Sequence, residues 1–129
     1  MDIVALTFAA LAALVHVYIF YLESIVWTSK KARPVFGTTA EEAQITRALA
    51  FNQGFYNLFL AIVVIIGIGF MGAGESEIGV TAIFIGAGSM MAAALVLLLS
   101  NPGKRKAAMT QGAFPLLCLI TLTIALMVR

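Results

Sequence analysis

Four long apolar stretches, separated by shorter polar ones, define the pattern of this chain. They cover about residues 3–27, 55–71, 78–99 and 113–128, and each is near the roughly 20 residues that a helix needs to cross a bilayer. The apolar residues are continuous and do not alternate with polar ones, which excludes a transmembrane β-barrel. In hydrocarbon the backbone must satisfy its own hydrogen bonds, so such stretches form helices. The pattern predicts an all-α membrane protein, a bundle of four transmembrane helices, with one integral membrane domain over residues 1–129.

The first apolar stretch lies where a secretory signal peptide would lie. Its start carries Asp2 and no Lys or Arg, and its apolar part is longer than the usual core of about 7–15 residues. We therefore interpret this stretch as a retained transmembrane helix.

Composition strengthens the membrane assignment. Of the 129 residues, 62% are hydrophobic and 11% are charged, whereas charged residues make up about 25% of a typical soluble domain. So few charges cannot cover the surface of a soluble protein of this size. A soluble enzyme and a nucleic-acid-binding domain are excluded, and we expect membrane lipids and no nucleic acid as partners.

The basic residues predict the orientation in the membrane. Two connections hold seven of the eight basic side chains. The connection after the first stretch holds Lys30, Lys31, Arg33 and Arg47, and the one between the third and fourth stretches holds Lys104, Arg105 and Lys106. The connection over residues 72–77 carries two glutamates and no basic residue. By the positive-inside rule the two basic connections are cytoplasmic, and both termini lie outside the cytoplasm.

The connection over residues 28–54 contains a second helix-start signal. Pro34 and Gly37 end the segment that follows the first span. Thr39 with Glu42 has the spacing of a capping box, and Thr38 with Glu41 has the same spacing, so the first residue of the helix stays open. No proline follows before the end of the second stretch. We predict one continuous helix from about Ala40 to Met71.

The polar residues within the spans are the candidate site. In the first span His16 and Glu23 share one helix face with Trp27. They are about 10 Å apart along the helix axis and cannot touch directly. We predict His16 and Glu23 as acid–base candidates that line a common pocket. The predicted ligand-binding residues come from three spans and are Tyr18, Arg47, Asn52, Gln53, Tyr56, Asn57 and Gln111.

Each of these residues also has a structural interpretation. His16 could hydrogen-bond a neighbouring helix, and Glu23 could reach the interface and pair with Arg47 or Lys30. Tyr18 could be an interfacial anchor, together with Tyr21 and Trp27. Cys118 is alone and lies in the fourth span, so it forms no intrachain disulfide and is expected to be a buried thiol.

The polar residues gather in the cytoplasmic halves of the spans. This placement predicts a pocket between the first two helices, open to the cytosol, for a small amphipathic or lipid-like ligand. The chain has no Ser/His/Asp set, no cluster of metal ligands and no phosphate loop, so we expect no metal and no cofactor, and whether the protein is an enzyme is left open. Two alternatives are a structural or interaction subunit without a catalytic site and a small transporter component.

Two segments resemble a known family. The segments are His16-Val17-Tyr18-Ile19-Phe20-Tyr21-Leu22-Glu23 and Asn52-Gln53-Gly54-Phe55-Tyr56-Asn57-Leu58-Phe59-Leu60-Ala61. They resemble the signature segments of the bacterial domain-of-unknown-function family numbered thirteen hundred and four, which consists of short integral membrane proteins with four helices. The resemblance covers essentially the whole chain and implies a multi-pass protein of the bacterial cytoplasmic (inner) membrane. It implies no activity.

A weaker resemblance is to the membrane-associated proteins of eicosanoid and glutathione metabolism. It rests on the basic first connection and on Arg47-Ala48 and Asn52 at the start of the second helix. This chain has Ala50-Phe51 where that family has a His beside the Asn, and Phe55-Tyr56 where an acidic residue is expected. Glutathione chemistry is therefore not expected. The resemblance implies a homo-oligomer, with a trimer as the candidate form.

Overall fold

The computed structural model describes residues 2–128, which form helices and connections without a strand among them. The first span is α1 (Asp2–Phe20), extended by the short π-helix η1 (Tyr21–Ile25). The other spans are α4 (Arg47–Gly72), α5 (Ser76–Ser100) and α6 (Arg105–Met127), and the 3₁₀ turn η2 (Pro102–Lys104) precedes α6. Two short helices, α2 (Ala32–Phe36) and α3 (Ala40–Ile45), lie in the first connection. Four helices are thus long and apolar enough to cross a membrane, which confirms the predicted fold class.

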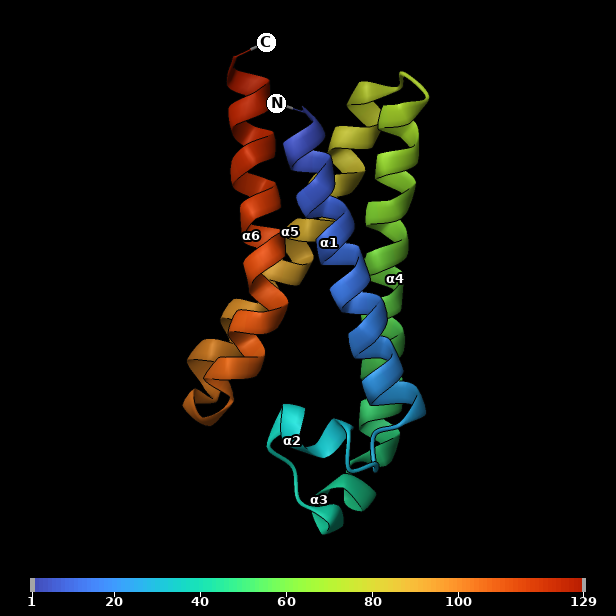
Figure 1. Cartoon of the computed structure of the whole chain (residues 1–129), viewed down its shortest axis with the longest axis vertical. Helices are drawn as coiled ribbons and strands as arrows, with labels where there is room; N and C mark the ends of the chain where they lie inside the picture. Colours follow the sequence, from blue (N-terminus) through green and yellow to red (C-terminus); the bar gives the residue numbers. More distant parts are fainter. Residues whose placement is uncertain (1, 129) are drawn as a thin grey trace.

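The four long helices form a bundle in which neighbours along the chain pack side by side (Figure 1). α1 and α5 each pack against both α4 and α6, while α1 and α5 face each other across the bundle with little contact. Successive helices run in opposite directions, so the described ends of the chain lie together at one end of the bundle. The first connection, with α2 and α3, and the turn between α5 and α6 lie at the opposite end. Most of the basic residues lie in these two connections or in the first helical turn that follows them, so this end is called the basic end below.

Small side chains fill the interior, and large apolar side chains cover the outside. The buried face of α1 includes Ala5, Ala9, Ala12 and Ala13, which belong to one core with residues of α4, α5 and α6. Cys118 is buried in the same core, as expected. Large residues such as Ile65, Ile85 and Ile124 are exposed on the outside: the bundle has the arrangement of a lipid-embedded protein, in which small residues let the helices approach.

The first connection contains a helix break that the sequence analysis did not predict. The prediction of one continuous helix from Ala40 to Met71 is wrong at Thr46, which separates α3 from α4. The Thr46 hydroxyl donates to the backbone oxygen of Glu42 at 2.7 Å and accepts a hydrogen bond from Trp27 Nε1 at 3.1 Å. A side chain that bonds the preceding turn and a residue outside the helix favours a bend at this position.

The start of α3 resolves the open choice between two capping boxes. Thr39 is the N-cap: its hydroxyl accepts from the amide of Glu42 at 3.1 Å, and the Glu42 carboxylate accepts from the amide of Thr39 at 2.9 Å. Gly37, which ends α2, has a φ of 62°. Glycine adopts this left-handed conformation without the steric cost that a side chain brings.

The observed helices extend further toward the basic end than the apolar stretches did. α4 begins at Arg47 and α6 at Arg105, whereas the stretches began at about residues 55 and 113. The extra turns carry polar residues, which can remain helical at the level of the lipid headgroups. Hydropathy therefore located the apolar parts of the long helices but not the helix ends.

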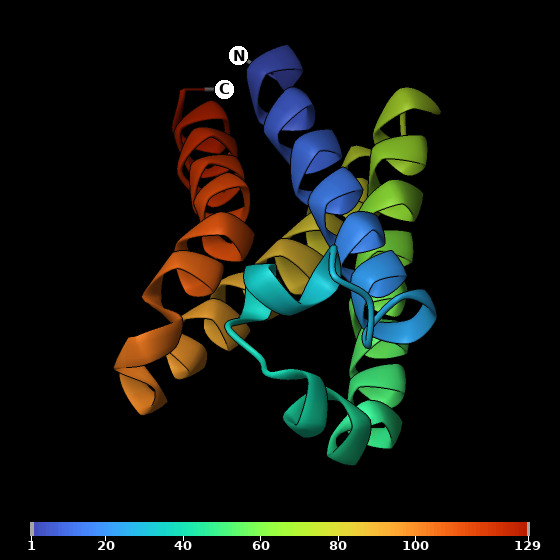
Figure 2. The same ribbon diagram turned by 60° about the horizontal axis from the view of Figure 1, so that its bottom comes forward.

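The bundle opens at its basic end. α1 and α4 diverge there from α5 and α6, and α2 lies across the opening in both views (Figures 1 and 2). α6 changes direction near its middle, and it contains the buried Pro115. Proline has no N–H and cannot hydrogen-bond the carbonyl four residues earlier, which here belongs to Gln111, so it kinks a helix.

Candidate functional site

A cavity of about 440 Å³ occupies the opening at the basic end. Every long helix contributes to its wall, and so do η1, α2 and η2. Its inner wall is polar and its opposite wall, from α5, is largely apolar. The lining residues are His16, Glu23, Trp27, Phe36, Gln53, Asn57, Ala93, Val96, Leu97, Ser100, Lys104 and Gln111.

A buried hydrogen bond joins the first span to the second at this cavity. Asn57 Nδ2 of α4 donates to Glu23 Oε2 of η1 at 2.8 Å and also to the backbone oxygen of Gln53 at 3.2 Å. Glu23 and Asn57 each keep 9% of their surface exposed. Because both amide hydrogens of Asn57 are used, its side chain is held in one orientation against the carboxylate.

The close approach of η1 to α4 makes this bond possible. Gly54 faces η1, and a Cβ at that position would overlap Ser24 Oγ and lie 3.0 Å from the Ser24 amide nitrogen and 3.1 Å from Glu23 Cβ. The Ser24 hydroxyl also donates to the backbone oxygen of Phe51 at 2.8 Å. Short π-helical segments are often found at functional sites, and here the wider turn buries Leu22 and Glu23 side by side.

His16 is anchored to its own helix. Its Nδ1 lies 2.9 Å from the backbone oxygen of Ala12. A carbonyl oxygen only accepts, so Nδ1 carries the hydrogen and Nε2 of the neutral ring is an acceptor. The ring keeps 2% of its surface exposed and lines the cavity. The sequence analysis had considered a hydrogen bond from His16 to a neighbouring helix. In the structure the ring bonds Ala12 of its own helix instead.

The structure brings together part of the predicted site. His16, Glu23, Gln53, Asn57 and Gln111 all line the cavity. The cavity that they line is enclosed by α5, α6 and α2 as well as by the first two long helices.

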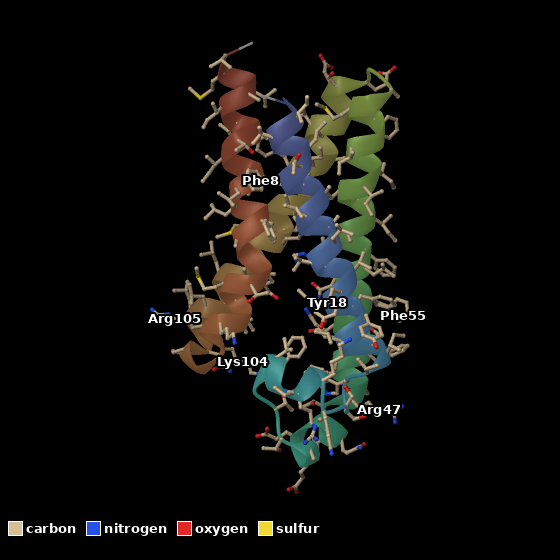
Figure 3. All side chains as sticks on the ribbon, viewed as in Figure 1. Phe8, Tyr18, Arg47, Phe55, Lys104 and Arg105 are labelled. Carbon is tan, nitrogen blue, oxygen red and sulfur yellow. The ribbon has the colours of Figure 1, made fainter. Side chains whose placement is uncertain are left out.

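The remaining predicted residues lie elsewhere. Tyr18, Asn52 and Tyr56 are exposed on the outside of the bundle. Arg47 points away from it (Figure 3) and lines a separate cavity of about 120 Å³ beside Glu23. Helical periodicity explains the split on α4: Gln53 and Asn57 are one turn apart on the inner face, whereas Asn52 and Tyr56 are one turn apart on the next face.

Tyr18 forms an aromatic cluster on the outer surface. Its ring lies 6.3 Å from that of Tyr21, and Lys31 Nζ lies 5.8 Å and 5.1 Å from the two ring centroids. A lysine over exposed tyrosines at the basic end is the arrangement expected of residues that anchor a helix at the headgroup level. This supports the anchor interpretation that the sequence had left open for these tyrosines.

Several lining residues were not predicted as ligand-binding. Trp27 could have been found, because it shares the helix face of His16 and Glu23, and its ring packs 5.0 Å from that of Phe36. Lys104 had been assigned only to orientation, yet Figure 3 shows it on the side of the α5–α6 turn that faces α2, while Arg105 points away. The sequence gives no indication that the α5 residues line a cavity, because the apolar wall of a cavity has the same composition as a lipid-facing surface. The unpredicted residues are Trp27, Phe36, Ala93, Val96, Leu97, Ser100 and Lys104.

The fold and this cavity define a small polytopic membrane protein with a polar site at its basic end. Among the described residues, no group of three or more His, Cys, Asp or Glu is placed to hold a metal ion. The chain belongs to the family described as "Protein of unknown function (DUF1304)", whose family model matches residues 10–123, and the predicted membership is confirmed. Searches of the curated proteins and of the solved structures return no significant match, so nothing supports the weaker resemblance to the eicosanoid and glutathione proteins.

Proposed function

We propose that this protein binds a small amphipathic or lipid-like molecule in the cavity at its basic end. The supporting observation is the convergence of polar groups from three spans on one cavity that has an apolar opposite wall. Its volume of about 440 Å³ falls within the range of ligand sites, roughly 300–1,000 Å³. Polar side chains are costly within a membrane and commonly mark binding sites or water-filled cavities there.

His16 and Glu23 act in this proposal as binding groups. Each has its hydrogen-bond partner elsewhere, in Ala12 and in Asn57, and neither bonds the other. The acid–base role predicted for them would require a substrate that reaches the free atoms of both. We assign no reaction step. The Glu23–Asn57 bond is also what a purely structural subunit would use to hold two helices together, and the binding experiment below separates the two functions.

We further propose that the basic end faces the cytoplasm of a bacterial cell. Lys30, Lys31, Arg33 and the three basic residues of the α5–α6 turn lie at one end, and Glu75 and Glu77 lie near the α4–α5 turn at the other. In intact cells, a membrane-impermeant maleimide should label Glu75→Cys and should label Lys106→Cys only after permeabilisation. Both positions are exposed, so accessibility does not bias the comparison. The reverse labelling pattern would contradict this orientation.

Filling the cavity tests the binding function directly. Ala93 and Ala92 are adjacent on α5 and both exposed, but Ala93 lines the cavity and Ala92 does not. We expect Ala93→Trp to abolish retention of a single-chain lysophospholipid, because the indole occupies the space the lipid would take. Native mass spectrometry of protein released from maltoside micelles measures the bound fraction.

Ala92→Trp is the matched control and should retain the lipid as the wild type does. Equal retention by the wild type and both variants would show that the lipid sits on the outer surface. No retention by any of them would favour the structural role. Thermal unfolding of each variant, followed by far-ultraviolet circular dichroism, verifies that the bundle is folded; the signal is helical and is not altered by the added tryptophan.

A further inference from the structure

The inner end of the cavity consists of hydrogen-bond acceptors. Asn57 uses both amide hydrogens on Glu23 and Gln53, which leaves its Oδ1 free. Glu23 accepts through Oε2, and in the ionised carboxylate the other oxygen, Oε1, can also only accept. His16 donates through Nδ1 to Ala12, which leaves Nε2 as an acceptor in the neutral ring. Three residues of the polar wall thus offer lone pairs and no hydrogen, and two of them, Glu23 and Asn57, are in direct contact.

The residues that carry these free atoms line the cavity, and Glu23 also lines the smaller cavity with Arg47. Among the described residues, the buried side-chain nitrogen or oxygen without a hydrogen-bond partner is Arg33 Nε. The free atoms of His16, Glu23 and Asn57 also lack a protein partner but are not closed off in this way, and their residues line the cavity. A ligand that fits this wall must bring hydrogen-bond donors, and the carboxylate of Glu23 favours a donor with a positive charge.

The mouth of the cavity has the opposite character. Lys104 lies at the α5–α6 turn, at the basic end, on the side that faces α2 (Figure 3), and it is the one cationic residue among the described residues that line the cavity. Ser100, the last residue of α5, also lines the cavity and adds a hydroxyl. Gln53 and Gln111 each carry both a donor and an acceptor and no charge, so they do not alter the preference of either end of the cavity for a positive or a negative group. Negative charge on a ligand is therefore favoured at the mouth and disfavoured beside Glu23.

We infer that the cavity selects a phospholipid headgroup that ends in a primary ammonium. The ammonium enters toward Glu23 and Asn57, the phosphate stays near Lys104, and the acyl chain follows the apolar wall formed by Ala93, Val96 and Leu97. A primary ammonium brings three N–H donors to a wall made of acceptors, whereas a quaternary ammonium brings the charge without donors. This inference rests on the proposed binding function and adds the class of headgroup to it.

A matched series of lysophospholipids tests the inference. Lysophosphatidylethanolamine, lysophosphatidylcholine and lysophosphatidylglycerol with the same acyl chain share the phosphate and differ in the terminal group. The unfolding midpoint of the full chain in maltoside micelles, measured against lipid concentration, yields an apparent Kd for each. We expect the ethanolamine lipid to bind about tenfold more tightly than the other two, as charge-assisted hydrogen bonds imply.

Two variants assign the selectivity to the two ends of the cavity. Glu23→Gln keeps an oxygen for Asn57 but removes the charge, and should bring the ethanolamine lipid to the affinity of the choline lipid. Lys104→Gln should weaken all three lipids by a similar factor, because all three carry the phosphate. If Glu23→Gln does not fold, the order of affinities in the wild type alone decides the inference.

The outcomes separate this inference from the proposed function. Equal binding of the three lipids, still blocked by Ala93→Trp, would overturn the headgroup selectivity and leave the binding function in place. Tighter binding of the glycerol lipid would also overturn it and would assign the site to anions. Binding of none of them would overturn both.

Discussion

Asn57→Leu is expected to lower the free energy of unfolding by about 1–3 kcal/mol, because it leaves a buried carboxylate without its donor. The donor is Asn57 Nδ2, 2.8 Å from Glu23 Oε2, and both residues are buried in the bundle. Unfolding of the protein in maltoside micelles by added dodecyl sulfate measures the effect. The single tryptophan, Trp27, lines the same cavity and reports the transition by fluorescence.

The double variant Glu23→Leu/Asn57→Leu should recover much of the lost stability. Replacing both partners by apolar groups removes the unpaired carboxylate, and such replacements are often nearly neutral. The double-mutant cycle should therefore give a coupling energy of about 1–2 kcal/mol. Asn52→Leu, on the exposed face of α4, should change stability by no more than about 0.5 kcal/mol. Additive effects of the two single variants would contradict the energetic importance of the Glu23–Asn57 bond.

Gly54→Ala is expected to destabilise the protein by about 1–3 kcal/mol, although alanine is the better helix former. The added Cβ would overlap Ser24 Oγ and would lie 3.0 Å from the Ser24 amide nitrogen. Rotation of the serine hydroxyl does not relieve the contact with the backbone. Relief requires η1 to move away from α4, and that movement also lengthens the bond between Glu23 and Asn57. The same unfolding assay measures the loss.

Gly69→Ala is the matched control on the same helix. Gly69 is exposed, and nothing lies within 4 Å of the Cβ that alanine would add, so helix propensity should raise stability by up to about 1 kcal/mol. Ser24→Ala combined with Gly54→Ala should restore part of the loss, because the overlapping hydroxyl is gone while the backbone contact stays. Equal stability of Gly54→Ala and Gly69→Ala would show that η1 and α4 separate without cost.

The membrane architecture could be predicted because it depends on properties that are local in the chain. A continuous apolar stretch such as residues 78–99 must be helical in hydrocarbon whatever its neighbours are, and α5 spans Ser76–Ser100. The capping box at Thr39 and Glu42 was one of two that the sequence offered, since its partners are three residues apart. The break at Thr46 was not predictable, because one of the two hydrogen bonds at its hydroxyl comes from Trp27 in a distant turn.

The candidate site was predictable only in part. Polar residues within apolar spans pointed to His16, Glu23 and Asn57, because burying them without a function or a partner is costly. The same reasoning also selected Asn52, Tyr56 and Tyr18, which are exposed. Polarity alone does not tell which face of a helix meets its neighbours, since a helix near the headgroups can carry polar residues on its outer face as well.

The sequence by itself determined that this chain forms four transmembrane helices, and its basic residues gather at one end of the bundle. These features arise from hydropathy and from charge, which act on each segment separately. Only the tertiary structure decided which polar groups share a cavity. That choice depends on three features. They are the close approach of η1 to α4 at Gly54, the divergence from α1 and α4 of the part of α6 that precedes Pro115, and the placement of α2 across the opening. The contact at Gly54 and the placement of α2 each join segments that are distant in the chain, and the physical reason is that a cavity belongs to the packing of the helices and to none of them alone.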